Sequence, residues 1–175
     1  MSPPDKPAGE YLPELTPTPE RRAERIAEIA GLPTKLRVAV TGLDASQLDT
    51  KYKNWTIRQI VHHLADSHAN AYVRFRLALT EETPSIKPYD ESKWVELSDA
   101  KSGDVELSLH LLEALHNRWV QLLRSMTDTD FLRAYFHPAQ NKAVALAEAI
   151  GVYAHHGRHH SAQIAWLRAQ NGWGA

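Results

Sequence analysis

Apolar residues recur at spacings of three and four along most of the chain, which is the period of an amphipathic helix. The first such stretch begins at Thr18 and Pro19, a typical N-cap residue followed by proline at the first helical position, and ends near residue 42. Three further helices are expected over residues 54–80, 104–126 and 142–172. No stretch alternates between apolar and polar residues as a half-buried strand does, so the pattern predicts an all-α protein.

Helices of this number and length predict a four-helix bundle with one long crossover, between the second and third helices. Residues 81–102 break the helical period and are too many for a tight turn. The shorter connections on either side allow the first two helices, and the last two, to run antiparallel, while the crossover reverses the middle pair. Long ordered loops often carry function, so Tyr89 and Trp94 are candidates to wall a pocket; a packed connector is the alternative.

Proline is concentrated at the N-terminus, and it divides the chain into two parts. Residues 1–17 are interpreted as an extended, proline-rich arm, because they contain no apolar periodicity and no hydrophobic segment typical of a signal peptide. Residues 18–175 are interpreted as a single bundle domain.

Charge and composition exclude several classes of protein. The chain has 20 Lys and Arg residues and 21 Asp and Glu residues, so its formal net charge is −1, and no basic stripe favours nucleic acid as a partner. The longest apolar run, Ala143 to Ala147, is far shorter than the roughly 20 residues that cross a bilayer. Cysteine is absent, which excludes disulfides, thiolate metal sites and a cysteine nucleophile, and fits a reducing compartment. We therefore expect a cytoplasmic protein without membrane or nucleic-acid partners. The sequence does not decide whether the protein is a monomer or a homodimer.

Histidine provides the candidate chemistry, and four of the ten histidines lie close together on the fourth helix. His155 and His159, and likewise His156 and His160, are four residues apart, so each pair shares one helix face and could hold one ion. At about 100° per residue, His156 and His160 fall beside and within the apolar stripe, whereas His155 and His159 point to solvent. The helical wheel therefore selects His156 and His160 as the buried pair.

A catalytic zinc site has three protein ligands, so a third histidine from another helix is expected. On the second helix the wheel places His68 on the apolar stripe, His63 on its flank and His62 further round. Periodicity alone therefore favours His68.

Other interpretations of the histidines stay open at this point. The cluster on the fourth helix fits a metal site and a polar face equally well, and His110, His116 and His137 are interpreted as solvated or hydrogen-bonded residues. Because no acidic residue lies within the cluster, a metal would be one that prefers imidazole: zinc first, then nickel, copper or iron.

Two segments of the chain closely resemble the YfiT-like branch of the DinB superfamily. These are WTIRQIVHHLADSHANAYVRFRLALTEETPSIKPYDESKW, at residues 55–94, and YAHHGRHHSAQI, at residues 153–164. GEYLPEL near the N-terminus and LHNRW at residues 115–119 extend the resemblance over nearly the whole chain. The resemblance implies a four-helix bundle with a long crossover, in agreement with the pattern above.

The resemblance also implies a divalent metal, zinc or nickel, held by His63, His156 and His160. His63 thus replaces the His68 that periodicity favours, and His68 becomes a packing residue or a partner of a ligand. Asp66 is a weaker candidate for such a partner, or else a solvated residue. Gly157 could allow close approach of a substrate or of a neighbouring helix.

The activities that the resemblance implies are metal-dependent hydrolysis and the transfer of bacillithiol, a small thiol, to an electrophile. Both use an ion with three neutral ligands, which lowers the pKa of a bound water or thiol. Because the chain has no cysteine, a transferase would need a small-molecule thiol and an electrophile as its substrates. We expect the transferase, with the hydrolase and a non-catalytic metal-binding bundle as alternatives.

Overall fold

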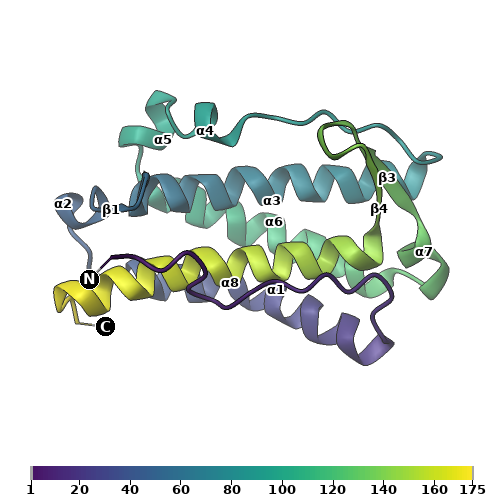
Figure 1. Cartoon of the computed structure of the whole chain (residues 1–175), viewed down its shortest axis with the longest axis horizontal. Helices are drawn as coiled ribbons and strands as arrows, with labels where there is room; N and C mark the ends of the chain where they lie inside the picture. The colour runs from purple at the N-terminus through teal and green to yellow at the C-terminus, as the bar shows by residue number, and fades with distance from the viewer. Residues whose placement is uncertain (1, 175) are drawn as a thin grey trace.

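The computed structural model describes residues 2–174, and four long helices form its frame (Figure 1). These are α1 (Pro19–Val40), α3 (Ile57–Thr80), α6 (Val105–Ser125) and α8 (Leu146–Asn171). The predicted all-α four-helix bundle is confirmed. Helices α1, α3 and α6 begin where side chains of Thr18, Thr56 and Asp104 accept hydrogen bonds from backbone N–H groups of the first turn.

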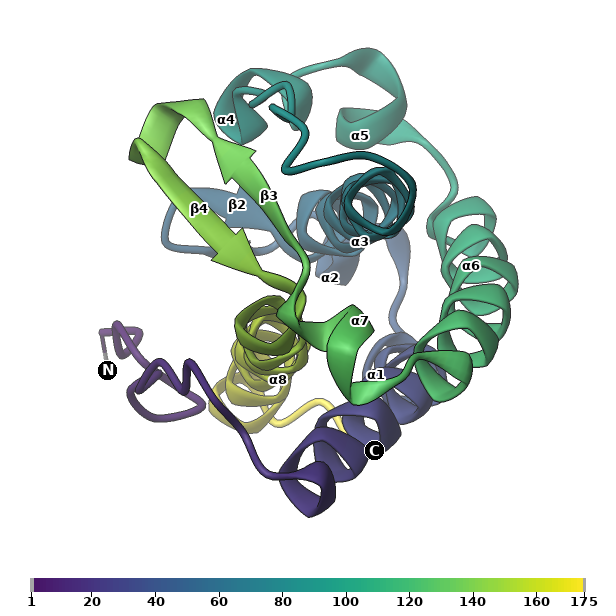
Figure 2. The same cartoon turned by 90° about the vertical axis from the view of Figure 1, so that its right-hand side faces the viewer.

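The helices pack around the bundle in an order different from their order in the chain (Figure 2). Helix α1 packs against α6 and α8, and α3 also packs against α6 and α8. The first two long helices, α1 and α3, run antiparallel, and so do the last two, α6 and α8, as expected, but the members of each of these pairs face each other across a diagonal of the bundle. The crossover after α3 makes α3 and α6 parallel neighbours, and α1 and α8 are the second parallel pair.

The connections contain more regular structure than the sequence pattern predicts. They contain α2 (Ala45–Leu48), β1 (Lys51–Tyr52), β2 (Trp55–Thr56), α4 (Glu91–Trp94), α5 (Ser98–Ser102), α7 (Asp128–Leu132), β3 (Ala134–His137), a 3₁₀ turn (Pro138–Gln140) and β4 (Lys142–Ala145). The strands form two antiparallel hairpins, β1 with β2 and β3 with β4.

The β3–β4 hairpin corrects the predicted start of the last helix. Residues 142–145 were expected to be helical, but they pair with β3 from Ala134 opposite Ala145 to His137 opposite Lys142. Asn141 adopts the left-handed conformation at the turn, with φ of 48°. The alanines of this segment favour a helix, and pairing with β3 overrides that local preference. Helix α8 therefore begins at Leu146.

The crossover lies along the outer side of α3 and is fixed to it by buried polar side chains (Figure 1). Gln59 Nε2 donates to the Val95 carbonyl at 2.8 Å, and Arg58 Nη1 donates to the Gly103 carbonyl at 2.8 Å. These bonds satisfy carbonyls outside regular structure, so the crossover is an ordered wall rather than a loose loop.

The apolar core consists of two clusters with histidines between them. One cluster gathers around Phe75, Trp119 and Ile150, and the other around Leu36, Leu64 and Leu112. His68 and His116 lie between them along α3 and α6, with exposed fractions of 0% and 1%. Buried imidazoles must find hydrogen-bond partners inside the protein, so this polar layer constrains the packing of the helices.

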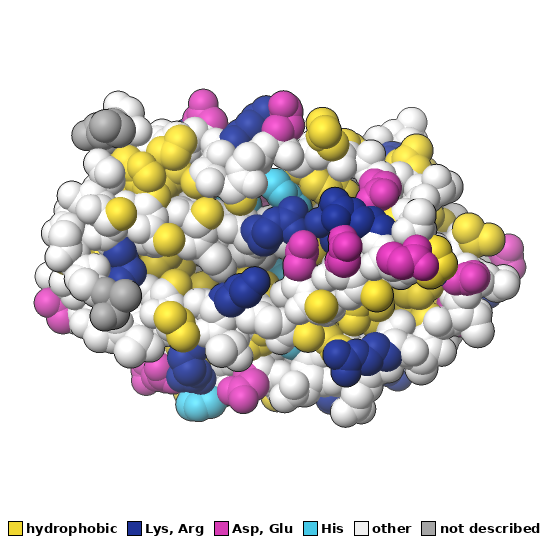
Figure 3. Space-filling model, turned by 90° about the horizontal axis from the view of Figure 1, so that it is seen from below, with side chains coloured by type: hydrophobic (Ala, Val, Ile, Leu, Met, Phe, Trp, Pro, Cys, Tyr) yellow, Lys and Arg dark blue, Asp and Glu magenta, His cyan; other side chains and the backbone are white. Residues whose placement is uncertain are grey.

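The N-terminal arm lies against α8 without forming a helix or strand of its own over residues 2–18 (Figure 1). Tyr11 packs on His155, with ring centroids 5.1 Å apart, and the Tyr52 hydroxyl donates to the Pro4 carbonyl. The face seen in Figure 3 mixes basic, acidic and apolar side chains. No helix within residues 2–174 is long and apolar enough to cross a membrane.

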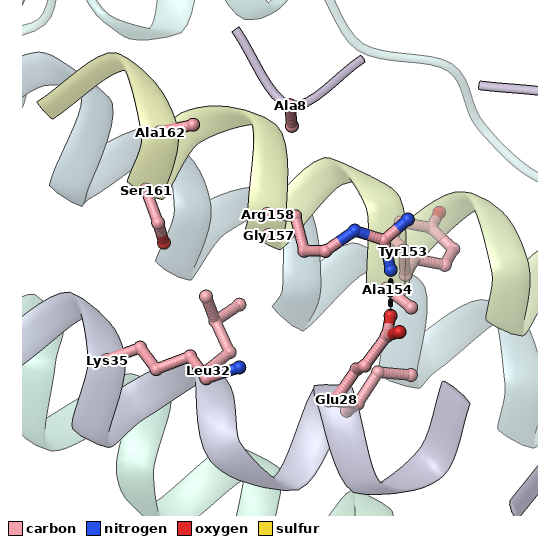
Figure 4. Close-up of a pocket in the computed structure, with 11 residues that line it drawn as sticks. Ala8, Glu28, Leu32, Lys35, Tyr153, Ala154, Gly157, Arg158, Ser161 and Ala162 are labelled. Atoms are coloured by element: carbon pink, nitrogen blue, oxygen red, sulfur yellow. Dashed lines mark hydrogen bonds and ion pairs between the residues drawn. The ribbon is translucent and has the colours of Figure 1, made fainter. Parts of the chain in front are cut away.

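Helices α1 and α8 approach closely where Gly157 faces Leu32 (Figure 4). A Cβ added at Gly157 would lie 2.6 Å from Leu32 Cδ2 and 3.0 Å from Leu32 Cδ1. Beside this contact is a cavity of about 310 Å³ that Ala8 of the arm helps to line. Of the two roles considered for Gly157, the structure supports close approach of a neighbouring helix.

Two glycine substitutions should change stability in opposite directions. Gly157→Ala should lower the free energy of unfolding by about 1–2 kcal/mol, since overpacking exceeds the gain in helix propensity. Gly31→Ala should raise it by about 0.5–1 kcal/mol, because the new methyl meets only Lys35 Cε at 3.8 Å. Urea unfolding of each variant measures both values. If the clash is the cause, Leu32→Ala should cost less in the Gly157→Ala background than alone; equal costs would contradict it.

Candidate metal centre

Three histidine side chains converge at the middle of the bundle, His63 from α3 and His156 and His160 from α8. His156 Nε2 lies 3.0 Å from His63 Nε2 and 3.1 Å from His160 Nε2. One ring nitrogen from each of the three lies within 4.8 Å of the other two. Ligand nitrogens about 2.0–2.1 Å from a tetrahedral zinc ion are about 3.3 Å apart, so small side-chain shifts would admit such an ion.

This group contains the three residues that the sequence and the resemblance together identify. The i, i+4 spacing brings His156 and His160 to one face of α8, as the helical wheel predicts. The wheel favours His68 on α3, and His68 is the more deeply buried residue there, but its ring contacts His156 from behind instead of joining the group. His63, on the flank of the apolar stripe, faces the other two histidines.

A chain of hydrogen bonds supports His156 from the opposite side. It begins at the carbonyl of Ile29, which has no partner within α1 because residue 33, four positions later, is a proline without an N–H group. His116 Nδ1 lies 2.6 Å from this carbonyl oxygen. His116 Nε2 lies 2.9 Å from His68 Nδ1, and His68 Nε2 lies 3.3 Å from His156 Nδ1.

The direction of this chain follows from its first member. A carbonyl oxygen only accepts, so His116 Nδ1 must carry the proton, and in a neutral ring its Nε2 must accept. The same logic applied to His68 makes its Nδ1 a donor and its Nε2 an acceptor. His156 therefore donates from Nδ1, and its Nε2 presents a lone pair to His63 and His160.

His160 is held in the same tautomer by a partner on its own helix. Its Nδ1 lies 2.7 Å from Gln163 Oε1, and Gln163 Nε2 lies 3.0 Å from His159 Nε2. His160 Nε2 is thereby left with a lone pair directed at His156 Nε2. Two lone pairs that face each other at this distance repel unless a cation lies between them, so this donor set fits a metal ion.

Burial keeps these imidazoles neutral near pH 7. Loss of solvation lowers the pKa of His63 to about 4 and that of His160 to about 3. It also lowers the pKa of His68 and His156 well below their usual range, and neighbouring imidazoles add to the effect. A metal ion requires deprotonated ligands, so these histidines are ready to bind one without losing a proton.

The group of three opens into a cavity of about 580 Å³. The crossover supplies Pro88, Tyr89 and Glu91 to its lining, and the β3–β4 hairpin supplies His137 and Gln140. Tyr89 thus lines the cavity as expected, while Trp94 packs behind it with ring centroids 4.4 Å apart. Trp55 of β2 covers the histidines, with its ring centroid 4.6 Å from that of His63.

The remaining candidates occupy other places. His155 and His159 lie outside the group of three, as expected. The expectation that both point to solvent is wrong, because the arm covers His155 and His159 lines the cavity. Asp66 makes no hydrogen bond to a histidine; burial, with a smaller contribution from the charge of Asp99, raises its pKa to about 6. His110 is exposed, which agrees with its interpretation as a solvated residue. His116 is a core residue with a hydrogen bond, which agrees with the second interpretation.

The chain of imidazoles predicts a single tautomer for each of its members. In metal-free protein at neutral pH, two-bond ¹⁵N–¹H spectra should show His116, His68 and His156 protonated at Nδ1. His116→Phe should remove this restriction from the other two rings, because His68 loses its acceptor, and His110→Phe on the exposed face of α6 should not. Protonation of His156 at Nε2 in the unsubstituted protein would contradict the direction of the chain.

Stability should fall in acid because the buried histidines resist protonation. Burial lowers the pKa of His116 from 6.5 to about 4. Between these values the unfolded chain binds the additional proton, so the free energy of unfolding decreases as the pH falls, by about 1.4 kcal/mol per pH unit for each such histidine. Urea unfolding in the presence of a chelator at pH 7, 6 and 5 measures this slope. His116→Phe should reduce it and His110→Phe should not; a slope equal in both variants would show that His116 is not responsible.

Comparisons with known proteins agree with the geometry. A model of the DinB superfamily matches residues 28–164. "Putative metal-dependent hydrolase YfiT" of Bacillus subtilis (strain 168) is 48% identical over 169 residues, which cover 95% of each chain. A protein of Bacillus mycoides (strain KBAB4), also named a putative metal-dependent hydrolase, is 48% identical over 95% of this chain and 96% of its own.

Solved structures show the same fold. YfiT from Bacillus subtilis, described as a probable metal-dependent hydrolase with an unusual four-helix bundle topology, superposes with a TM-score of 0.93. It is 47% identical, and the match covers 97% of this chain and 98% of that one. A mycothiol-dependent maleylpyruvate isomerase matches with a TM-score of 0.66 and 16% identity over 82% of this chain and 60% of that one, which shows a shared fold alone. By its sequence and by its structure, the chain belongs to the DinB superfamily.

Proposed function

We propose that the protein is a metal-dependent enzyme that joins a small-molecule thiol to an electrophile. The observation that carries the proposal is the convergence of three imidazole nitrogens at the inner end of a cavity of about 580 Å³. His63, His156 and His160 would hold one divalent ion, zinc first and nickel or iron as alternatives. Three protein ligands leave a position open, and the cavity is within the size range of small-molecule sites.

The ion would supply activation of the nucleophile, since three neutral ligands leave its full charge to lower the pKa of a thiol or a water molecule. The chain's own residues do the rest. His68 and Gln163 hold the rings of His156 and His160 in one orientation. Trp55 covers the ring of His63, and Tyr89 forms part of the wall of the cavity. Sulfur bonds to the electrophilic carbon, the leaving group departs with its bonding electrons, and the thiol proton passes to solvent.

Hydrolysis is the second candidate, and the names of the relatives favour it. Proteins 48% identical to this chain are called putative metal-dependent hydrolases. The same three histidines and the same cavity would serve a water nucleophile, so the two candidates differ only in the molecule that enters.

Metal binding should depend on three of the clustered histidines and not on their neighbours. When His63, His156 and His160 are each replaced by Ala in separate variants, zinc affinity should fall by about tenfold or more in each, because two imidazoles rarely hold an open zinc site. His155→Ala is the matched control from the same helix and should retain full metal content. Equilibrium dialysis followed by elemental analysis measures the bound ion. Equal loss from all four variants would contradict the assignment of ligands.

Turnover distinguishes transfer from hydrolysis. Metal-loaded protein should consume monochlorobimane only when a thiol is added, with bacillithiol among the thiols tested, and the conjugate should appear in the mass spectrum. His160→Ala should abolish the metal-dependent rate, and His155→Ala should keep it. If the metal-loaded protein instead cleaves esters or amides without a thiol, and no thiol forms a conjugate, the transferase proposal is wrong and the protein is a hydrolase.

A further inference from the structure

A cationic side chain lines the cavity without an anionic partner. Arg74 of α3 makes one hydrogen bond, from Nη1 to the Tyr153 hydroxyl at 2.9 Å, and within residues 2–174 it forms no ion pair. An arginine has five N–H donors in a fixed fork that matches a carboxylate. The fork of Arg74 is half-buried and mostly unused, which is costly for a charge unless a ligand completes it.

A second polar group lies unused beside it. His137, at the end of β3, lines the same cavity, and its Nδ1 is buried without a hydrogen-bond partner in the described part of the chain. Arg74 and His137 both line this cavity, and burial, followed by the positive charge of Arg74, lowers the pKa of His137. A buried nitrogen without a partner is rare in folded proteins and needs an explanation.

Arg74 and His137 lie at the opposite end of the cavity from the candidate metal centre. Arg74 lies three turns beyond His63 on the same helix, about 16 Å along the helix axis. Tyr153, which holds the guanidinium of Arg74, lies one turn before His156 on α8. One end of the cavity therefore presents the three histidines and the other presents Arg74 and His137. Glu91, the acidic side chain in the lining, lies on the exposed side of the crossover.

We propose that Arg74 and His137 form a binding subsite for a carboxylate group at the end of the substrate remote from the metal. This inference rests on the proposed function, because it takes the reacting sulfur to lie at the three histidines. It adds the class of substrate: an elongated molecule with a thiol at one end and a carboxylate at the other. Arg74 is a binding residue in this proposal and takes no part in the bond-forming step.

Matched ligands test the subsite directly. Mercaptopropionate, mercaptohexanoate and mercaptooctanoate are titrated into zinc-loaded protein by calorimetry, each beside the mercapto alcohol of the same length. At one chain length the carboxylate should bind about tenfold or more tightly than the alcohol, as expected for hydrogen bonds to a charged group. Arg74→Met should remove this advantage and leave the affinity for the alcohols unchanged, and Arg74→Lys should keep part of it.

The same helix provides a control for the loss of an arginine. Arg76 also donates to a tyrosine hydroxyl, that of Tyr72 at 3.1 Å, but it is exposed and does not line the cavity. Arg76→Met should therefore leave the preference for carboxylates intact. A carboxylate that bound only the zinc ion would keep its advantage in Arg74→Met, which would overturn the subsite.

Alkyl carboxylates without sulfur separate failure of the subsite from failure of the proposed function. Octanoate should bind more tightly than octanol, and this difference should also depend on Arg74. If no thiol binds but octanoate binds through Arg74, the subsite stands and the thiol is wrong. If thiols bind and neither series prefers the carboxylate in an Arg74-dependent way, the thiol stands and the subsite is overturned.

Discussion

Buried polar groups must be hydrogen-bonded inside the protein, and this requirement organises the centre of the bundle. Pro33 leaves the Ile29 carbonyl of α1 without its helical partner, and His116 of α6 donates to it. From that bond the direction of every further hydrogen bond is fixed, through His68 of α3 to His156 of α8. One proline in α1 therefore determines that His156 carries its proton on Nδ1 and presents the lone pair of Nε2 to the candidate metal centre. The same imidazoles separate the two apolar clusters, so all four long helices contribute to one polar layer.

Helix α8 connects this layer to both the core and the cavity. On one side, Gly157 allows α1 to approach so closely that a methyl group would clash with Leu32. On another side, His156 and His160 face α3 and the open cavity. Ligands carried by a helix that is packed this tightly keep their positions before an ion binds, and such preorganisation is what a precise metal site requires. The packing of α1 on α8 thus supports the site, although no residue of α1 lines the cavity.

The sequence predicts the parts of this structure that depend on helical periodicity. The four long helices, the starts of the first and third at Thr18 and Asp104, and the inward direction of His156 and His160 all follow from local patterns, whereas the second helix was expected from residue 54 and begins at Ile57 after a short strand. Periodicity favours His68 over His63 because a helical wheel measures burial, and His68 is indeed the more buried; His63 was identified by resemblance. The bond between His116 and the Ile29 carbonyl joins residues 87 positions apart, so no local pattern contains it. Arg74 and His137 stand out only because partners are missing in three dimensions. The β3–β4 hairpin was missed because pairing outweighs the helical preference of its alanines.

The order of the helices around the bundle has a consequence for synthesis of the chain. Helix α1 packs mainly against α6 and α8 rather than against α3, which follows it directly, so the first long helix finds its main neighbours only after most of the chain has left the ribosome. Contacts between distant segments form late, because the intervening chain must first be ordered. The apolar face of α1 is exposed until then, at a stage when such surfaces promote aggregation. Since His156 and His160 also lie on the last helix, closing the core and assembling the three histidines are the same event.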